Sequence, residues 1–198
     1  MILRGITATL SRLITGVRLL PRAPCDGKSA IYYANHASHL DFAVVWAALP
    51  AEAREKLSPA AAEDYWSQSA WRRWVACRLF QAVLIPRENI TRSNNPVDRL
   101  AAAIEQGRSV LIFPEGTRRP DGTVGEFRPG LHHLVKRFPG MPLVPVYLEN
   151  LSRILPKGTF LPVPIIAQAH FRTPITLLEG EPKNLFLERA RAALLPSD

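Results

Sequence analysis

The sequence predicts a single α/β domain with a mostly parallel central sheet flanked by helices. Short runs rich in β-branched and aromatic residues alternate with helical patterns, and proline-marked tight connections join them without an interdomain linker. The length of 198 residues is enough for one hydrophobic core and short for two. A hydrophobic content of 47% with 21% charged residues is ordinary for a folded chain and excludes a disordered protein.

The expected elements follow from apolar patterning and turn residues. The predicted strands cover 29–35, 81–87, 109–113, 142–148 and 165–171. The predicted helices cover 40–49, 95–107, 129–138 and 182–195. Gly107 closes the second helix and Pro129 opens the third. Because helices separate the strands, we expect parallel pairing, with the functional loops beyond the carboxyl ends of the strands.

The composition limits the function classes. Lysine and arginine number 25 against 17 aspartate and glutamate, a net charge of +8, and 20 of the basic residues are arginine. Guanidinium groups bind phosphate bidentately, so this balance suits phospholipid head groups, nucleotide phosphates or nucleic acid, although a codon bias would explain it equally well. The two cysteines, Cys25 and Cys77, are too few for a disulfide-stapled secreted fold and favour a reducing compartment.

Residues 1–22 have the pattern of an amphipathic helix. At about 100° per residue the aliphatic side chains share one arc, and arginine and hydroxyl side chains lie opposite. The aliphatic arc consists of Ile2, Leu3, Ile6, Leu10, Leu13, Ile14, Val17 and Leu20. We expect a membrane-associating helix over 1–24 and a globular domain over 25–198. Arg12 and Arg18 argue against a secretory signal, whereas packing of the helix on the domain's own core stays open.

A second segment, 65–80, favours membrane contact because tryptophan beside arginine suits a lipid–water boundary. It contains Trp66, Trp71 and Trp74 together with Arg72, Arg73 and Arg78. No stretch reaches the roughly 18 uninterrupted apolar residues that a membrane span needs. We therefore expect a peripheral or monotopic protein on the cytoplasmic face of the cell membrane.

The stretch NHASHLD, from Asn35 to Asp41, is the first candidate site. On one helix His36 and Asp41 would lie roughly 140° apart, so they do not share a helix face. If the helix begins near Ser38, the carboxylate can fold back onto the imidazole and orient it as a general base. A capping box between Ser38 and Asp41 explains the same residues without catalysis. A metal site of His36, His39 and Asp41 is the third interpretation.

The second candidate site is the loop 113–122, FPEGTRRPDG, which follows a predicted buried strand. It combines a flexible backbone, a hydroxyl and guanidinium groups, which together can hold a phosphate monoester. The residues are Glu115, Gly116, Thr117 and Arg118, with Arg119 and Arg128 nearby. A simple surface turn is the alternative, because PDG is a turn sequence.

Together the two stretches resemble the glycerolipid acyltransferase family, whose members carry an Asn-His-x4-Asp block followed by a Pro-Glu-Gly-Thr-Arg block. Here these blocks are Asn35, His36 and Asp41, and then residues 114–118. The resemblance covers about residues 28–150. The two blocks occur in the family's order and spacing, which makes the pair specific.

Two further family blocks are weaker in this chain. They are QAVLIPR, ending at Arg87, and VPVYL, starting at Val144. Gln81 stands where the first of them usually has glycine, and Pro86 stands where it often has an acidic residue.

The resemblance implies an acyltransferase domain over 25–198 that moves a fatty acyl group from acyl-CoA or acyl carrier protein to a lysophospholipid hydroxyl. The acceptor would be 1-acylglycerol-3-phosphate, giving phosphatidic acid, or another lysolipid such as a lyso-ornithine lipid or lysophosphatidylethanolamine. By the same resemblance His36 is the base, Asp41 orients it, and Glu115, Gly116, Thr117 and Arg118, with Arg87, hold the glycerol phosphate. Asn35 and Ser38 have a supporting role. No cofactor, metal or nucleic-acid partner is implied; the membrane surface and acyl carrier protein are the expected partners.

Two rival functions are also compatible with the sequence. A metal-dependent hydrolase would use His36, His39 and Asp41, and activity that survives a strong chelator eliminates it. A nucleic-acid binder would explain the net charge, although no nucleic-acid motif accompanies the arginines; binding to duplex DNA that weakens steeply with salt would support it.

Overall fold

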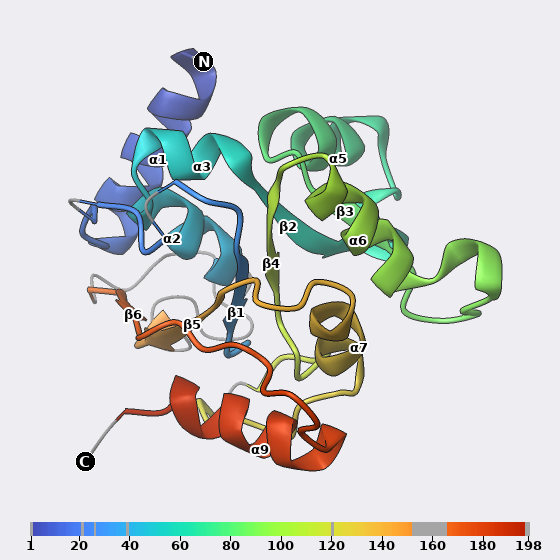
Figure 1. Ribbon diagram of the computed structural model, residues 1–198. Helices are drawn as coiled ribbons and strands as arrows, with labels where there is room; N and C mark the ends of the chain where they lie inside the picture. Colours follow the sequence, from blue (N-terminus) through green and yellow to red (C-terminus); the bar gives the residue numbers. More distant parts are fainter. Residues whose placement is uncertain are drawn as a thin grey trace.

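The centre of the protein is a six-stranded sheet, seen in a computed structural model that describes residues 2–20, 22–25, 27–38, 40–119, 121–151 and 166–196 (Figure 1). The strand order is β3-β2-β4-β1-β5-β6, and only the pairing of β5 with β6 is antiparallel. The strands are β1 (Ile31–Ala34), β2 (Leu57–Ala62), β3 (Val83–Ile85), β4 (Ser109–Ile112), β5 (Leu143–Glu149) and β6 (Gln168–Phe171). The predicted single α/β domain with a mostly parallel sheet is confirmed.

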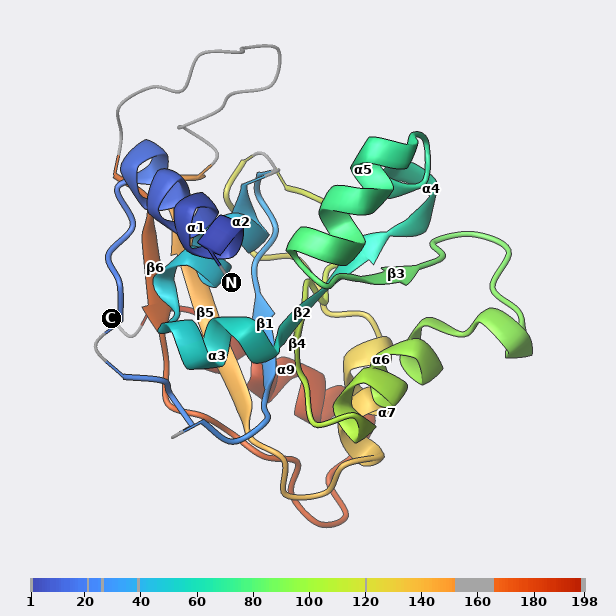
Figure 2. The same cartoon turned by 90° about the horizontal axis from the view of Figure 1, so that it is seen from above.

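Helices cover both faces of the sheet (Figures 1 and 2). One face carries α1 (Ile2–Thr15), α2 (Asp41–Ala48) and α3 (Ala51–Lys56), and the other carries α6 (Pro96–Glu105), α7 (Gly130–Lys136) and α9 (Lys183–Leu194). Strand β1 shows how the core is divided: Tyr32 packs toward the α2 face, whereas Ile31 and Tyr33 pack toward the α9 face. A strand that is buried on both faces reads as a continuous apolar run, which is why β1, β4 and β5 are readable from the sequence.

Strand β2 is absent from the sequence-based prediction. Its sequence, LSPAAA, contains a proline and three alanines, which are unfavourable in strands. Pro59 lies at the point where the strand changes partner: residues 57–59 pair with β4, and residues 60–62 pair with β3. The strand therefore lies inside the sheet despite its composition.

The segment 65–80 is a compact helical unit. It comprises the end of α4 (Glu63–Trp66), α5 (Ala70–Trp74) and a π-helix over Val75–Leu79. Trp71 and Trp74 are exposed on this unit, whereas Trp66 packs edge-on against Phe42 of α2 at 6.5 Å between ring centroids. Two of the three tryptophans thus face outward.

Helix α1 packs on α2 with its small and polar side, and its aliphatic arc faces outward. Ala8 and Thr15 are buried, and Arg12 Nη1 donates to the Ala47 carbonyl at 3.3 Å. The exposed aliphatic residues are Ile2, Leu3, Ile6, Leu10, Leu13 and Ile14. The helix ends at Thr15, earlier than the predicted residue 22, and Gly16 follows in the left-handed region at φ 69°. The arc along the helix itself is therefore not used for packing on the domain, whereas Val17, beyond the helix end, is buried.

Within the part of the chain that the structure describes, no helix has both the length and the apolar content needed to cross a bilayer. Strand β6 begins at Gln168; the predicted start at residue 165 lies outside the described residues.

Candidate active site

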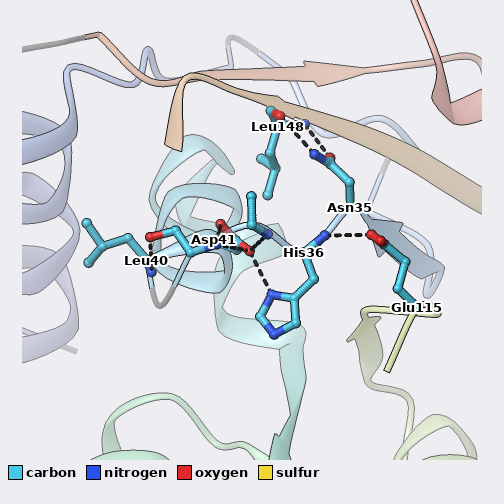
Figure 3. A network of polar contacts seen from close by, with 8 residues as sticks. Asn35, His36, Leu40, Asp41, Glu115 and Leu148 are labelled. Carbon is cyan, nitrogen blue, oxygen red and sulfur yellow. Dashed lines mark hydrogen bonds and ion pairs between the residues drawn. The ribbon is translucent and has the colours of Figure 1, made fainter. Parts of the chain in front are cut away.

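His36 and Asp41 are in direct contact at the carboxyl end of β1 (Figure 3). The Nδ1 atom of His36 lies 2.7 Å from Oδ2 of Asp41. An ionised carboxylate can only accept, so Nδ1 is the donor in this bond, and in the neutral ring Nε2 then presents its lone pair. The spacing argument is confirmed: His36 lies in the turn before the helix, and the carboxylate folds back from the first helical turn.

Asp41 is completely buried at the start of α2. Besides His36, its carboxylate accepts from the backbone N–H groups of Ala37 at 2.7 Å and Ser38 at 2.9 and 3.0 Å. The helix begins at Asp41, not near Ser38, and only half of the expected capping box forms, because the Ser38 hydroxyl accepts from Leu40 N instead. Three donors therefore fix the buried carboxylate in one orientation.

The imidazole of His36 is held on its face as well as at its edge. The ring stacks on Phe113, with 4.3 Å between centroids and an interplanar angle of 20°. The His36 side chain is 24% exposed, and Nε2 has no hydrogen-bond partner among the described residues. Phe113 contacts the candidate base, and the sequence pattern did not single it out because it ends an ordinary apolar run.

Asn35 joins the end of β1 to β5. Its side-chain amide donates to the Leu148 carbonyl at 2.9 Å and accepts from the Leu148 N–H at 2.7 Å. The amide thus replaces one backbone rung of the β1–β5 ladder, which lets the main chain leave the sheet at His36 (Figure 3). These two bonds are what the structure shows of Asn35, and its supporting role in catalysis stays a prediction.

Glu115 connects the two candidate loops from inside the protein. Its side chain is buried; Oε1 accepts from His36 N at 2.8 Å and Oε2 accepts from Gly125 N at 2.9 Å. A further bond runs from Arg119 N to the His36 carbonyl at 2.8 Å. Both carboxylate oxygens thus accept hydrogen bonds from the main chain. The sequence predicted that Glu115 would contact the acceptor's phosphate, and the structure places its side chain inside the protein instead.

The loop after Glu115 is exposed beside the histidine. Gly116, Thr117 and Arg118 are all exposed, and Gly116 has φ 71°. A Cβ atom at Gly116 would lie 2.5 Å from Nε of Arg128, which itself donates to the Glu115 carbonyl at 3.2 Å. The left-handed backbone conformation favours glycine here, and a larger residue would displace the Arg128 guanidinium from its place beside the loop. The guanidinium of Arg128 therefore lies against the loop, although Arg128 is not one of the four loop residues predicted to bind the substrate.

Arg87 is not brought to this group in the structure. It follows β3, which is three strands from β1, and its guanidinium forms a two-pronged pair with Asp64: Nε donates to Oδ1 at 3.0 Å and Nη2 donates to Oδ2. The hydrogen bond from Arg87 holds the pKa of the Asp64 carboxyl below its usual range. A cavity of about 260 Å³ beside this pair is lined by Glu63, Asp64, Pro86, Arg87, Glu88 and Asn89.

The metal alternative has no cluster to support it in the described ranges, where no three histidine, cysteine or acidic side chains converge as ligands. His39, which that alternative requires, lies outside the described residues.

The protein combines an α/β sheet with a His–Asp pair at the carboxyl edge of that sheet, and the pair is joined to a Pro-Glu-Gly-Thr-Arg loop. This combination is typical of an acyltransferase. The profile of the family described as Acyltransferase matches residues 12–149, and the chain belongs to this family. The resemblance read from the sequence blocks is confirmed.

Curated relatives carry the same kind of name. A 1-acyl-sn-glycerol-3-phosphate acyltransferase of Limnanthes alba is 31% identical over 150 residues, covering 75% of this chain and 50% of that protein. The chloroplastic 1-acyl-sn-glycerol-3-phosphate acyltransferase BAT2 of Brassica napus is 26% identical over 145 residues, covering 73% of this chain and 40% of that protein. The chain spans about half the length of these relatives or less.

The fold also matches a solved structure. PlsC, the 1-acyl-sn-glycerophosphate (LPA) acyltransferase of Thermotoga maritima, superposes with a TM-score of 0.74 at 20% identity, covering 96% of this chain and 76% of that chain. At this identity the match supports the architecture.

Proposed function

We propose that this protein transfers a fatty acyl group from a thioester, either acyl-CoA or acyl-acyl carrier protein, to the hydroxyl of a lysophospholipid. The leading candidate for the acceptor is 1-acylglycerol-3-phosphate. The observation that carries the proposal is the His36–Asp41 pair, whose Nε2 is unengaged among the described residues and whose backbone is tied to the Pro-Glu-Gly-Thr-Arg loop. The names of the relatives support the same acceptor.

The proposed reaction needs one base and no covalent acyl-enzyme. Nε2 of His36 takes the proton from the acceptor hydroxyl as its oxygen attacks the thioester carbonyl. The tetrahedral intermediate then breaks the carbon–sulfur bond, and the imidazolium returns the proton to the leaving thiolate. Asp41 stabilises the imidazolium and keeps the ring in the productive tautomer. Stacking on Phe113 holds the imidazole ring in one plane, so little conformational entropy has to be lost to orient the base for the attack.

The acceptor's phosphate is assigned to the exposed part of the loop. Gly116 and Thr117 supply backbone and hydroxyl donors, and Arg118 with Arg128 supplies guanidinium groups next to them. Glu115 has a positioning role in this proposal, because both oxygens of its carboxylate bind main-chain N–H groups.

A second candidate acceptor is a lysolipid with an amine in its head group. The cavity beside Arg87 is lined by the carboxylates of Glu63, Asp64 and Glu88. Asp64 pairs with Arg87 and Glu63 pairs with Arg99 at 2.7 Å, so Glu88 is the lining carboxylate without an ion pair among the described residues. Such a site favours an ammonium group over a phosphate monoester. Asp64→Asn separates the two cases: it lowers the KM for 1-acylglycerol-3-phosphate if Arg87 binds phosphate, and it raises the KM for an amine-bearing lysolipid if the carboxylates bind the head group.

The protein is further proposed to work at a membrane surface, on the cytoplasmic face. The exposed aliphatic arc of α1 and the exposed Trp71 and Trp74 offer two apolar contacts, and α1 and α5 lie at the same end of the molecule in Figure 1. Isolated apolar side chains on a surface are normal, but a complete helix face is not. The same arrangement would bring the lysolipid's acyl chain to the site without leaving the lipid phase.

The test is direct. Purified protein is incubated with isotope-labelled acyl-CoA, or with acyl-acyl carrier protein, and a panel of lysolipids that includes 1-acylglycerol-3-phosphate and lysophosphatidylethanolamine, and the product is identified by mass. We expect labelled phosphatidic acid from the native protein and from the control His133→Ala, an exposed histidine on α7, and none from His36→Ala. Transfer by His36→Ala at a rate near the native one would reject the histidine as the base.

A further inference from the structure

Phe80 packs against the helix that begins with Asp41. It follows the π-helix Val75–Leu79 and is only 7% exposed. Its ring meets Phe42 edge-on, with 4.6 Å between the centroids, and it meets Trp46 edge-on at 5.1 Å. Phe42 and Trp46 are four residues apart, so they lie on one face of α2, one turn above the other. Phe80 therefore spans the first two turns of α2.

The start of α2 depends on contacts of this kind. The helix has eight residues, and no side chain of the described chain caps its first N–H groups. A helix this short is not stable from its own hydrogen bonds and needs packing against its neighbours. Asp41 and Phe42 are its first two residues. A rotation or shift of this turn therefore moves the carboxylate that binds Nδ1 of His36.

Phe42 is held between two aromatic side chains. Trp66 of α4 contacts it edge-on from one direction, and Phe80 contacts it edge-on from another. Aromatic rings prefer such edge-to-face arrangements because the positive edge of one ring meets the negative face of the other. The two contacts therefore fix the direction of the Phe42 ring in addition to burying it.

The backbone that carries Phe80 has two uncommon features. The first is the π-helix, because helices of this kind are rare and occur mostly at functional sites. Phe80 N donates to the Val75 carbonyl at 3.2 Å and so closes the last wide turn. The second is Gln81, whose φ of 54° lies in the left-handed region that residues with a side chain rarely adopt. The family usually has glycine at this position, and glycine adopts that conformation freely.

Arg108 holds Gln81 in this conformation. The side-chain oxygen of Gln81 accepts from Nη2 of Arg108, and Nε of the same guanidinium donates to the hydroxyl of Ser58 in β2. Arg108 directly precedes β4, so the two bonds join the turn to the centre of the sheet. An unfavourable backbone conformation persists only where the surrounding structure enforces it. The turn therefore fixes Phe80 relative to the sheet from which His36 emerges.

We propose that Phe80 is a positioning residue for acyl transfer. It holds the first turn of α2 through Phe42, and the held turn keeps the carboxylate of Asp41 on Nδ1 of His36. Its action on the pair is indirect and passes through the helix. The inference rests on the function proposed above, since it assigns a role within the same reaction.

The experiment compares Phe80→Leu with Phe186→Leu, a matched control on α9. Phe186 is also buried, but it packs on the opposite face of the sheet. Both variants lose the same ring from the core, so kinetics are measured at a temperature at which circular dichroism shows both to be folded. We expect kcat for transfer to 1-acylglycerol-3-phosphate to fall about tenfold in Phe80→Leu alone, with the acceptor KM unchanged. A full misplacement of about 1 Å costs about 10²-fold, and a loosened helix start costs less.

The ring nitrogens of His36 give a readout that does not depend on turnover. In the neutral ring, nitrogen-15 shifts of the labelled full-length protein distinguish a proton on Nδ1 from a proton on Nε2. We expect one tautomer in the native protein and in Phe186→Leu, and a mixture in Phe80→Leu. A single tautomer in Phe80→Leu would overturn the proposal, as would an equal loss of kcat in the two variants. If the native protein transfers no acyl group, the function proposed above fails, whereas the ring signals still decide the role of Phe80.

Phe42→Leu tests the same contact from the side of α2, and it stays informative if Phe80→Leu does not fold. We expect the same mixture of tautomers and a kcat about tenfold below the native value. In the double variant kcat should fall no further than in the single variants, because one contact links the two residues. Single effects that multiply to about 10²-fold in the double variant would show that the two residues act separately and would overturn the proposal.

Discussion

Replacing Glu115 with glutamine separates a positioning role from contact with the substrate. The carboxylate accepts one N–H from His36 and one from Gly125, whereas an amide oxygen can accept only one of them and its NH2 group must face the other. One charge-assisted bond is lost, worth about 1.5–3 kcal/mol, and a buried N–H is left unpaired at a cost of about 1–3 kcal/mol. We expect a loss of about 3 kcal/mol in the free energy of unfolding.

The same change should lower kcat by about 10²-fold, because the main chain of His36 loses a support and a small misplacement of a reacting group costs that much. The KM for the acceptor should hardly change. Steady-state acyl transfer and denaturant unfolding measure both quantities, and Glu126→Gln, an exposed glutamate in the same segment, is the control. A Glu115→Gln protein with native stability and kcat but a raised acceptor KM would refute the reasoning and place the carboxylate on the substrate.

Three further outcomes are expected. Asp41→Asn lowers kcat at least about 10²-fold and destabilises the protein by about 3 kcal/mol, since the buried carboxylate serves three donors; native turnover would contradict this. Arg189 lowers the pKa of Glu181, so this pair stabilises the fold above the unfolded pKa of about 4.3 and loses that effect as the pH falls through the folded pKa. Glu181→Gln should therefore cost about 1 kcal/mol in denaturant unfolding at pH 7 and nothing in strong acid, whereas a constant difference refutes the assignment. Ile6→Ser should reduce flotation with anionic vesicles about tenfold, and Leu185→Ser on α9 should not; equal flotation of both variants excludes the α1 face as the contact.

The central strands could be predicted because their burial on both faces leaves an apolar signature. Strand β2 could not be, because its pairing is imposed by its neighbours, β3 and β4, and not by the preference of its own residues. Helix α1 shows a related limit. Periodicity located the aliphatic arc but could not say which side faces the domain, and the small residue Ala8 allows the opposite side to approach α2 closely.

The site was predictable to the extent that its contacts are local in the chain. His36 and Asp41 are five residues apart, so backbone geometry alone suggested their meeting. The bond from His36 N to Glu115 joins residues 79 positions apart, and the pairing of Arg87 with Asp64 spans 23 positions. Contacts of that kind depend on the order of strands in the sheet, which a single sequence does not specify.

The amide of Asn35 fits Leu148 in only one way, with its donor on the carbonyl and its acceptor on the N–H. Deamidation would turn that donor into a second acceptor and set it against the carbonyl oxygen, which would open the sheet beside the histidine. We therefore expect protein that carries a one-dalton gain in mass at Asn35 to have lost activity.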